Sequence, residues 1–406
     1  MPRVLFLSPG YPAEMPHFVS GLAEVGAEVF GLGDQPQSLL PLSVRRALAG
    51  YLRVRSLWDE GAVVGEALAW LAGREPDRVE CLWEPGMILA ARLREALGAR
   101  GLSVERTVPF RNKERMKQVL DAAGIRTPRH AAAREALEIR AAAERIGFPL
   151  IVKPIAGAGS ADTHRVENAG ELERAIEATR HVEEVSVEEF VDGEEYTFDT
   201  VSIDGEPAFH NVAWYRPRPL VARTQEWISP QVVALRRPDQ SQLAAGVEMG
   251  RKVLAALGFE TGFTHMEWYR KADGEVVFGE IGGRPPGAHQ VDQMNYACDI
   301  DVFRGWAEAV SFGRFSESVR RLYNVANVYK RAQGSGTIRR IVGMDEFRRR
   351  YADAIVWENL LPVGSPRRNW KQTLVSDGFV VVRHPELRAT LALADELGTE
   401  VQLFAA

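Results

Sequence analysis

Residues 263–287 read FTHMEWYRKADGEVVFGEIGGRPPG, which places two strand-like runs on either side of a polar, Gly-containing turn. Glu267 lies in the first run and Glu280 near the end of the second. In such a hairpin the two carboxylates come side by side, and their repulsion then requires a cation or a proton. Carboxylate oxygens suit Mg²⁺, which proteins hold through one or two carboxylates together with substrate phosphates. Arg284 follows as a bidentate anion donor, while an exposed hairpin with ordinary surface charges is the alternative.

A phosphate-binding segment is indicated upstream of this hairpin. Residues 148–153 (FPLIVK) form a short apolar run typical of a buried strand. The run ends at Lys153, and a small-residue loop follows that contains Gly157, Gly159 and Ser160. A lysine at a strand end beside such a loop can hold phosphates through its ammonium and through backbone N–H groups. Because a single glycine-rich loop is more often an ordinary turn, this segment does not identify a nucleotide site alone.

Residues 185–203 (VSVEEFVDGEEYTFDTVSI) indicate a strand, an acidic connection and a second strand. We expect a linker between two lobes here, which is a suitable place for an adenine ring. Glu188 is a candidate acceptor for the exocyclic amine, and Glu195 for the ribose hydroxyls. The backbone of Phe190 and Val191 is expected to pair with the edge of the ring. A plain hairpin with an acidic turn is the alternative.

The order of these features, rather than any one of them, resembles the ATP-grasp superfamily. The resembling stretch runs from about residue 111 to residue 287 and opens with the NKERMK segment around Lys113. The resemblance implies that ATP binds with its phosphates near Lys113 and Lys153. It also implies one or two Mg²⁺ ions on Glu267 and Glu280, with Mn²⁺ as an alternative ion.

One position departs from the family pattern. Gly282 stands where the family usually has an asparagine that binds metal, two residues after the second carboxylate. Because glycine has no side chain to ligate a metal, the number of ions stays open. The same glycine, together with His265 two residues before Glu267, resembles the subgroup of carboxylate–amine ligases that join amino acids, the L-amino acid ligase-like group.

The resemblance implies a reaction that forms an amide or peptide bond through an acylphosphate, with release of ADP and phosphate. Arg284 is expected to hold the carboxylate or to stabilise the oxyanion. His265 or His289 is expected to accept a proton from the incoming ammonium, since a free amine is the nucleophile. For each histidine, a packed and hydrogen-bonded structural role is an equal alternative.

Four further residues are candidates for contact with the substrates. Arg216 and Arg223 lie in the Pro- and Arg-rich stretch WYRPRPLVART at 214–224, which we expect to form a mobile loop near the phosphates. Solvated loop arginines are the alternative for both. Gly287 and His289 follow the Pro-Pro dipeptide after Arg284 and are expected to wall the pocket of the acceptor substrate.

Two other functions stay open. The first is a carboxylase-type ATP-grasp enzyme that phosphorylates bicarbonate, which the short loop at 156–160 disfavours. The second is a nucleotide-binding regulator with little turnover. Gly282 keeps this second reading open, whereas the retained Lys153 and Arg284 argue against it.

Composition indicates a cytoplasmic enzyme acting on small molecules. The net charge of −5 among 406 residues argues against binding to nucleic acid or to anionic membranes. No apolar run reaches the ~18 residues of a membrane helix. The two cysteines, Cys81 and Cys298, are too few for a zinc cluster and fit a reducing compartment. A homodimer is the expected assembly.

The chain is predicted to be a multidomain protein of the α/β and α+β classes. Residues 1–108 alternate strand and helix, as a doubly wound α/β domain does. Residues 109–312 are expected to form a two-lobed ATP-grasp domain with its small lobe at about 148–190, and residues 313–406 an α+β domain. In an open α/β sheet, ligands bind outside the carboxyl ends of the strands, which predicts a ligand contact in loop 8–16.

Overall fold

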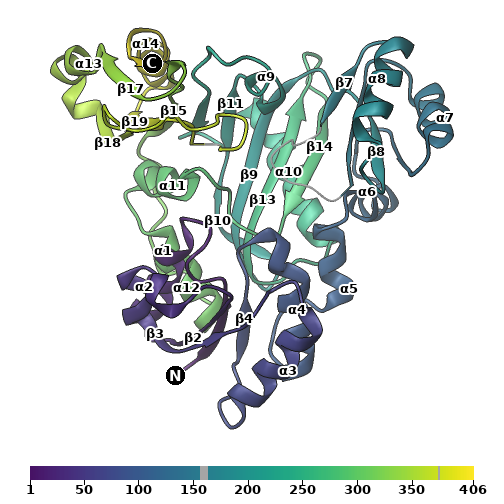
Figure 1. Cartoon of the computed structure of the whole chain (residues 1–406), viewed down its shortest axis with the longest axis vertical. Coiled ribbons are helices and arrows are strands. Elements are labelled where there is room, and N and C mark those ends of the chain that lie inside the picture. Colours follow the sequence, from purple (N-terminus) through teal and green to yellow (C-terminus); the bar gives the residue numbers. More distant parts are fainter. Residues whose placement is uncertain (156–162, 374) are drawn as a thin grey trace.

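The computed structural model describes residues 1–155, 163–373 and 375–406. Three lobes surround a central sheet (Figure 1): the N-terminal lobe lies at the bottom of the view, a small lobe at the upper right, and the C-terminal helices at the upper left. This arrangement confirms the predicted α/β and α+β multidomain fold. Gly157, Gly159 and Ser160, predicted at the phosphates, lie outside the described residues.

The N-terminal lobe is a parallel four-stranded sheet in the order β3-β2-β1-β4. Val4 and Phe6 of β1 pack with α1, whereas Leu5 and Leu7 pack with α3 and α4, so the sheet is covered on both faces. Burial on both faces explains why β1 is a continuous apolar run. The elements are β1 (Arg3–Leu7), α1 (Met15–Glu24), β2 (Glu28–Gly33), η1 (Gln37–Leu39), α2 (Leu42–Ala47), β3 (Leu48–Arg53), α3 (Glu60–Leu71), β4 (Arg78–Glu80), η2 (Glu84–Gly86) and α4 (Met87–Leu97).

The small lobe is an antiparallel sheet in the order β5-β8-β6-β7 with two helices packed on it. Short helices lead from the N-terminal lobe to α6, which joins this sheet. The elements of this region are α5 (Val104–Thr107), η3 (Val108–Phe110), α6 (Lys113–Ala122), β5 (His130–Ala133), α7 (Ala136–Ile146), β6 (Leu150–Pro154), β7 (His164–Val166), α8 (Ala169–Thr179) and β8 (Val185–Glu189). The lobe therefore includes β5 and α7, upstream of the predicted start near residue 148.

The large sheet runs β14-β13-β9-β11-β12-β15-β19-β18, with β10 added on β9. Because β12 pairs with β15, the sheet continues across the predicted boundary at residue 312. Its strands are β9 (Glu194–Ile203), β10 (Glu206–Asn211), β11 (Ala213–Arg216), β12 (Gln231–Ala234), β13 (Gly262–Arg270), β14 (Val276–Gly282), β15 (Asn324–Tyr329), β18 (Ile355–Leu360) and β19 (Gly378–His384). The smaller sheet β16-β20-β17 joins Gln333–Gly334, Gln402–Ala405 and Ile338–Val342.

The stretch at 214–224 differs from its prediction as a loop. It forms the end of β11 and the helical turn α9 (Pro219–Ala222). The strand forms because β11 pairs along its whole length with β12, and a proline at the start of a helix costs no hydrogen bond. Tertiary pairing thus overrides the turn-like composition of this stretch.

Helices cover the two faces of the large sheet unequally. One face packs on α10 (Ser241–Ala256) and α14 (Leu387–Glu400), with α13 (Met344–Tyr351) and η4 (Ala352–Ala354) beside them. The other face packs on α11 (Gln290–Cys298), α12 (Val302–Phe312) and the N-terminal α1 at its lower end. Its upper end opens toward the small lobe (Figure 1) and carries the predicted site residues.

Candidate active site

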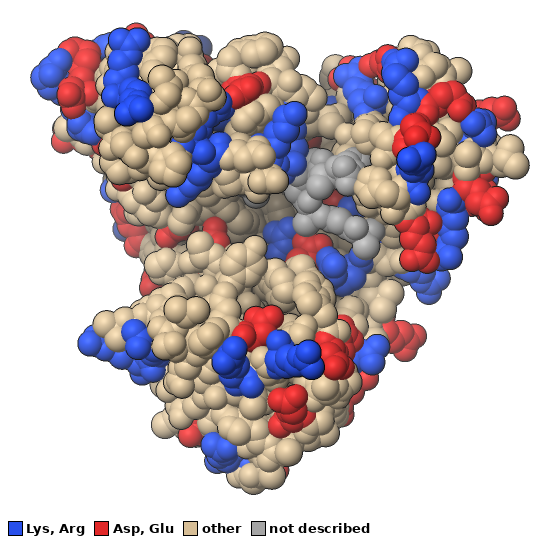
Figure 2. Space-filling model, viewed as in Figure 1, with Lys and Arg blue, Asp and Glu red and all other residues tan. Residues whose placement is uncertain are grey.

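The predicted hairpin that carries Glu267 and Glu280 is formed by β13 and β14. Figure 2 shows a hollow between the three lobes, with acidic and basic side chains at its base. Strands β13 and β14 are antiparallel, and Glu267 stands directly opposite Glu280. Their side chains remain 29% and 31% exposed. Cross-strand partners of this kind have Cβ atoms about 4.5–5.5 Å apart, so the two carboxylates share one site.

Each carboxylate of the hairpin has a cationic neighbour. Lys113 Nζ lies 2.7 Å from Glu280 Oε1. His265 Nε2 lies 3.5 Å from Glu267 Oε1, and the Tyr215 hydroxyl donates to the same oxygen at 3.2 Å. Burial raises the pKa of Glu267, but the hydrogen bond and charge of His265 outweigh burial, and the pKa lies below its usual value. Glu267 is therefore held ionised and ready to bind a cation.

Two carboxylates on one hairpin fit Mg²⁺ better than a metal that needs a full set of protein ligands. Among the described residues, no group of three or more His, Cys, Asp or Glu side chains gathers as a metal site. Mg²⁺ keeps several waters and takes its remaining oxygens from substrate phosphates, so two carboxylates suffice. Glu267 and Glu280 are thus suited to an ion that arrives with a nucleotide.

A buried aspartate holds His265 in place. Asp199 of β9 is fully buried, and its Oδ1 lies 2.6 Å from His265 Nδ1. Its other oxygen accepts from the Thr197 hydroxyl at 2.8 Å and the Asn211 amide at 3.1 Å. Burial lowers the pKa of His265, but the hydrogen bond and charge of Asp199 raise it to about 9. The imidazolium is therefore clamped between Asp199 and Glu267. Sequence reasoning missed Asp199, although it shares a strand face with Glu195.

Arg284 is held by a carboxylate from the N-terminal lobe. Its Nε and a terminal nitrogen each lie 2.9 Å from Glu84 Oε2. Glu84 is buried at the carboxyl end of β4 and also pairs with Arg111. The third guanidinium nitrogen donates to the Pro285 carbonyl at 2.9 Å. This anchor fixes the plane of the guanidinium beside the hairpin. Sequence reasoning missed Glu84, and its place at the edge of a parallel sheet was the available signal.

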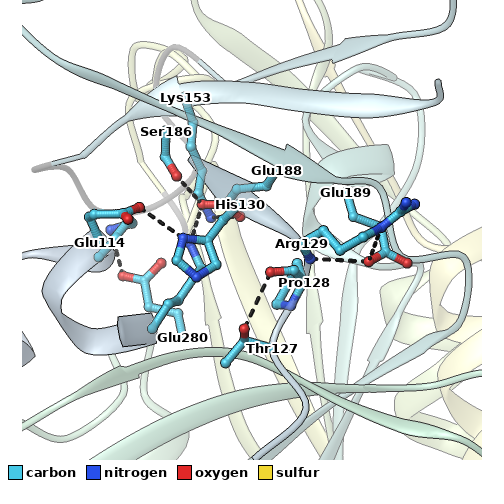
Figure 3. A network of polar contacts seen from close by, with 12 residues as sticks. Glu114, Thr127, Pro128, Arg129, His130, Lys153, Ser186, Glu188, Glu189 and Glu280 are labelled. Atoms are coloured by element: carbon cyan, nitrogen blue, oxygen red, sulfur yellow. Dashed lines mark hydrogen bonds and ion pairs between the residues drawn. The ribbon is translucent and has the colours of Figure 1, made fainter. Parts of the chain in front are cut away.

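Charged side chains meet at the end of the site nearest the small lobe, and Figure 3 shows Lys153, Ser186 and Glu188 of this cluster. Lys153 Nζ lies 2.9 Å from Glu188 Oε2, and Lys117 pairs with the other oxygen of Glu188. The Ser186 hydroxyl donates to Glu188 at 2.7 Å. Burial raises the pKa of Glu188, but the charges of Lys117 and Lys153 outweigh burial and hold the pKa well below its usual range. Lys117 lies one helical turn after Lys113, so α6 brings one lysine to Glu188 and another to Glu280.

Glu195, predicted to accept from the ribose hydroxyls, is joined through Arg218 to the predicted adenine linker at Phe190 and Val191. Arg218 Nε lies 3.3 Å from Glu195 Oε2, and another Arg218 nitrogen donates to the Val191 carbonyl at 2.8 Å. The Arg218 guanidinium also lies over the Phe190 ring, 4.9 Å from its centroid, while the Phe190 N–H donates to the Pro149 carbonyl. Burial, and then the nearby charge of Glu267, raise the pKa of Glu195 to about 8. Glu195 therefore keeps its proton to higher pH than an exposed carboxyl group does.

The predicted substrate residues are spread over two regions. Arg216 donates to Gln231 and Asp395 on the α14 side of the sheet, opposite the neighbouring Tyr215. Arg223 donates to the Lys371 carbonyl at 3.5 Å. Neither arginine joins the hairpin group, because adjacent residues of a strand point to opposite faces and Arg223 lies beyond α9.

Gly287 and His289 lie between Arg284 and the start of α11. The Gly287 carbonyl accepts from the Gln290 N–H. His289 Nδ1 lies 3.0 Å from Asp292, and the imidazole packs against the rings of Trp357 and Phe379 with centroids 4.8 and 4.9 Å away. Its backbone has a φ of 60°, and its N–H donates to Glu14 at 3.3 Å. Strained backbone held by contacts from three regions is typical of functional loops.

One segment of the chain matches the model of a known domain family. Residues 118–293 match the ATP-grasp domain family. An L-arginine-specific L-amino acid ligase of Bacillus subtilis is 23% identical over 67% of this chain and 66% of its own length. A D-alanine–D-alanine ligase of Pseudomonas fluorescens is 31% identical over 43% of this chain and 53% of its own length. The chain therefore spans about two thirds or less of the length of these curated relatives.

Solved structures share the fold along the whole chain. The L-amino acid ligase from Bacillus licheniformis has a TM-score of 0.81 at 20% identity, covering 100% of this chain and 99% of its own. The N5-carboxyaminoimidazole ribonucleotide synthetase from Thermotoga maritima has a TM-score of 0.71 at 17% identity, covering both chains fully. At these identities the likeness shows a common fold.

Proposed function

We propose that this chain, whose residues 118–293 form an ATP-grasp domain, is an ATP-dependent carboxylate–amine ligase that joins two amino acids. The proposal is carried by one observation. Glu267 and Glu280 face each other on a hairpin, while Glu84 holds Arg284 beside them. The curated relatives named as amino-acid ligases support amino acids as the substrates.

The nucleotide is bound by cations that are already gathered in the cleft. We assign Lys113 and Lys153 to the phosphates, since each lies against a carboxylate of the site. Glu195 and the linker at Phe190 and Val191 are assigned to the ribose and adenine. Mg²⁺ held by Glu267 and Glu280, in one or two ions, offsets charge on the transferring phosphoryl group when bound.

The reaction then needs no side-chain nucleophile. A carboxylate oxygen of the first amino acid attacks the γ-phosphorus, the bond to ADP breaks, and an acylphosphate forms. The free amine of the second amino acid attacks the carbonyl carbon, and phosphate leaves with the former C–O bonding pair. Arg284 donates to the oxygen that becomes negative in this step. Orientation of the two substrates supplies a large part of the rate, on the order of 7–11 kcal/mol.

The two histidines near the site receive different roles. His265 lies between Asp199 and Glu267, with both ring nitrogens facing carboxylates, and we assign it to orienting Glu267. His289 lies in the loop beyond Arg284 and pairs with Asp292. A histidine oriented by a carboxylate is the usual arrangement of a proton acceptor. We therefore assign removal of the ammonium proton to His289.

The expected setting is the cytoplasm. Cys81 and Cys298 are both free and buried, as structural thiols in a reducing compartment are. Within the described residues, no helix combines the length and apolar character needed to span a bilayer.

Phosphate release tests the proposal directly. The enzyme is incubated with Mg²⁺-ATP and with amino acids singly and in pairs, and released phosphate is measured. The masses of the products are determined by mass spectrometry. Release that requires an amino acid pair, with a product one water lighter than the sum, is the expected result. ADP formation stimulated by bicarbonate alone would instead identify a carboxylase, and tight ATP binding with no ADP from any mixture would identify a regulator. Glu280→Gln serves as the inactive control.

A further inference from the structure

Three aromatic side chains meet at the carboxyl edge of the N-terminal sheet. The Trp83 ring makes edge contacts with Tyr11 and Trp58, with centroids 6.1 and 5.6 Å apart. Tyr11 follows β1, Trp58 follows β3 and Trp83 follows β4. Three separate loops thus build one aromatic cluster.

The cluster is left open although it is apolar. Tyr11 is 54% exposed and Trp58 is 69% exposed. Single exposed apolar residues are common, but adjoining ones that form a patch mark an interaction site. An aromatic ring can bury about 150–250 Å² against a partner, so the free faces of these rings are available to a ligand.

Two of the three loops, those that carry Tyr11 and Trp83, also contact Arg284 or the loop after it. Glu14, three residues after Tyr11, accepts the backbone N–H of His289 at 3.3 Å. Glu84, the residue after Trp83, holds Arg284 at 2.9 Å. In open α/β sheets this carboxyl edge is where ligands bind. Figure 2 shows that the part of the N-terminal lobe bordering the cleft is largely free of charged side chains.

We propose that Tyr11, Trp58 and Trp83 form the subsite that receives a large apolar or aromatic side chain of one of the two amino acids. This inference rests on the proposed ligase function and specifies the class of substrate. The rings provide flat apolar faces, which reward stacking and aliphatic contact. A small side chain such as that of alanine gains nothing from them, so the cluster sets a preference by size.

Trp58→Ala tests the subsite, because Trp58 is the most exposed of the three rings and its ring packs against that of Trp83. Wild type and variant are compared by amino-acid-dependent phosphate release with phenylalanine, leucine, arginine and alanine. We expect the ratio of kcat/KM for phenylalanine over alanine to fall about ten-fold in the variant, as loss of contacts in an apolar pocket does. Trp58→Phe should retain most of the preference.

The matched control is Leu68→Ala, which removes an exposed apolar side chain from α3 of the same lobe and should leave the ratio unchanged. Equal thermal unfolding temperatures of the variants show that the fold is intact. If wild type releases phosphate with amino acids but Trp58→Ala leaves the phenylalanine-to-alanine ratio of kcat/KM unchanged, the subsite is overturned and the ligase function stands. A loss confined to arginine also overturns it, since that marks a cation–π site. No amino-acid-dependent release by wild type overturns the ligase function and the subsite together.

Discussion

The two faces of strands β9 and β13 have opposite characters although alternate residues of the same strands make them. One face carries Glu195, Asp199, His265 and Glu267. The other carries Tyr196, Phe198, Met266 and Trp268, which pack on α10 and its neighbours. Strand geometry sends successive side chains to opposite faces, so the same pair of strands both builds the charged surface and anchors it to the core.

The difference shows how buried charge is tolerated next to a core. On the charged face each ionised group has a partner, such as Asp199 with His265 or Glu267 with Tyr215. Such pairs contribute little net stability, because desolvation offsets their attraction. On the apolar face, burial of Trp268 beneath α10 supplies the stability. We therefore expect changes on the first face to alter activity and changes on the second to alter stability.

The largest expected effect is that of Glu280→Gln on turnover. Loss of one of the two hairpin carboxylates should lower amino-acid-dependent ADP formation on the order of 10³-fold, since a metal ion supplies several kcal/mol of charge stabilisation. The unfolding temperature should change little. Glu206→Gln makes the same change of charge on β10, with a highly exposed side chain, and should leave the rate unaltered. Full activity in Glu280→Gln would remove the hairpin from the mechanism.

Glu84→Gln should lower kcat on the order of 10²-fold, as loss of one preorganised electrostatic group does. The reason is that Arg284 loses the carboxylate that orients it, so the guanidinium no longer points steadily at the reacting oxygen. KM for ATP should remain near the wild-type value, because Glu84 contacts none of the residues assigned to the nucleotide. Glu60→Gln, which breaks the surface pair with Arg92 in the same lobe, is the control. An equal rise in KM for ATP would indicate a general structural role.

Gly246→Ala addresses the apolar face. A Cβ at this position would lie 2.3 Å from the Trp268 ring, which is rigid and fully buried. The ring or α10 must then shift, which should lower the free energy of unfolding by about 1–3 kcal/mol. This loss exceeds the gain from the higher helix propensity of alanine, and urea unfolding measures the net change. Turnover at a temperature where the variant is folded should remain near wild type. A free energy of unfolding equal to that of wild type would contradict the close packing of α10 on Trp268.

Gly65→Ala is the matched change without a clash. Gly65 lies within α3, and nothing stands within 4 Å of the added Cβ. Alanine costs less conformational entropy than glycine in a helix, so the variant should gain about 0.5–1 kcal/mol. If Gly246→Ala lowers the free energy of unfolding and Gly65→Ala raises it in the same urea assay, the loss is due to packing on the apolar face.

The smallest effect concerns polar contacts away from the central sheet. Burial lowers the pKa of His130, but its hydrogen bonds to Glu114 and Asp121 outweigh burial and raise the pKa, while Lys117 opposes them. The folded chain therefore binds this proton more tightly than the unfolded chain. Its stabilisation is complete below the unfolded pKa of about 6.5 and is lost as pH rises through the folded pKa. Wild type and His130→Gln are compared by their free energies of unfolding, measured with urea at several pH values. The difference between them should become smaller as pH rises through the folded pKa. A difference that does not change with pH would contradict a raised pKa for His130.

Local patterns in the sequence predicted the strands that carry several of the candidate site residues. The hairpin of Glu267 and Glu280 follows from strand alternation on either side of a polar turn, and the register confirms it. The apolar run that ends at Lys153 predicted a buried strand, which is β6. These predictions succeed because the period of a strand and the chemistry of a turn depend on residues within a few positions of one another.

Contacts between distant residues were decided only by the tertiary structure. Glu84 and Arg284 are 200 positions apart, and the pairing of β12 with β15 joins strands on either side of the predicted domain boundary. The turn-like composition of 214–224 predicted a loop, but pairing with β12 made part of it a strand. The sequence alone determined which residue types lie on each strand face. The packing of lobes against one another decided which of those residues meet, because no local rule limits how two distant segments approach.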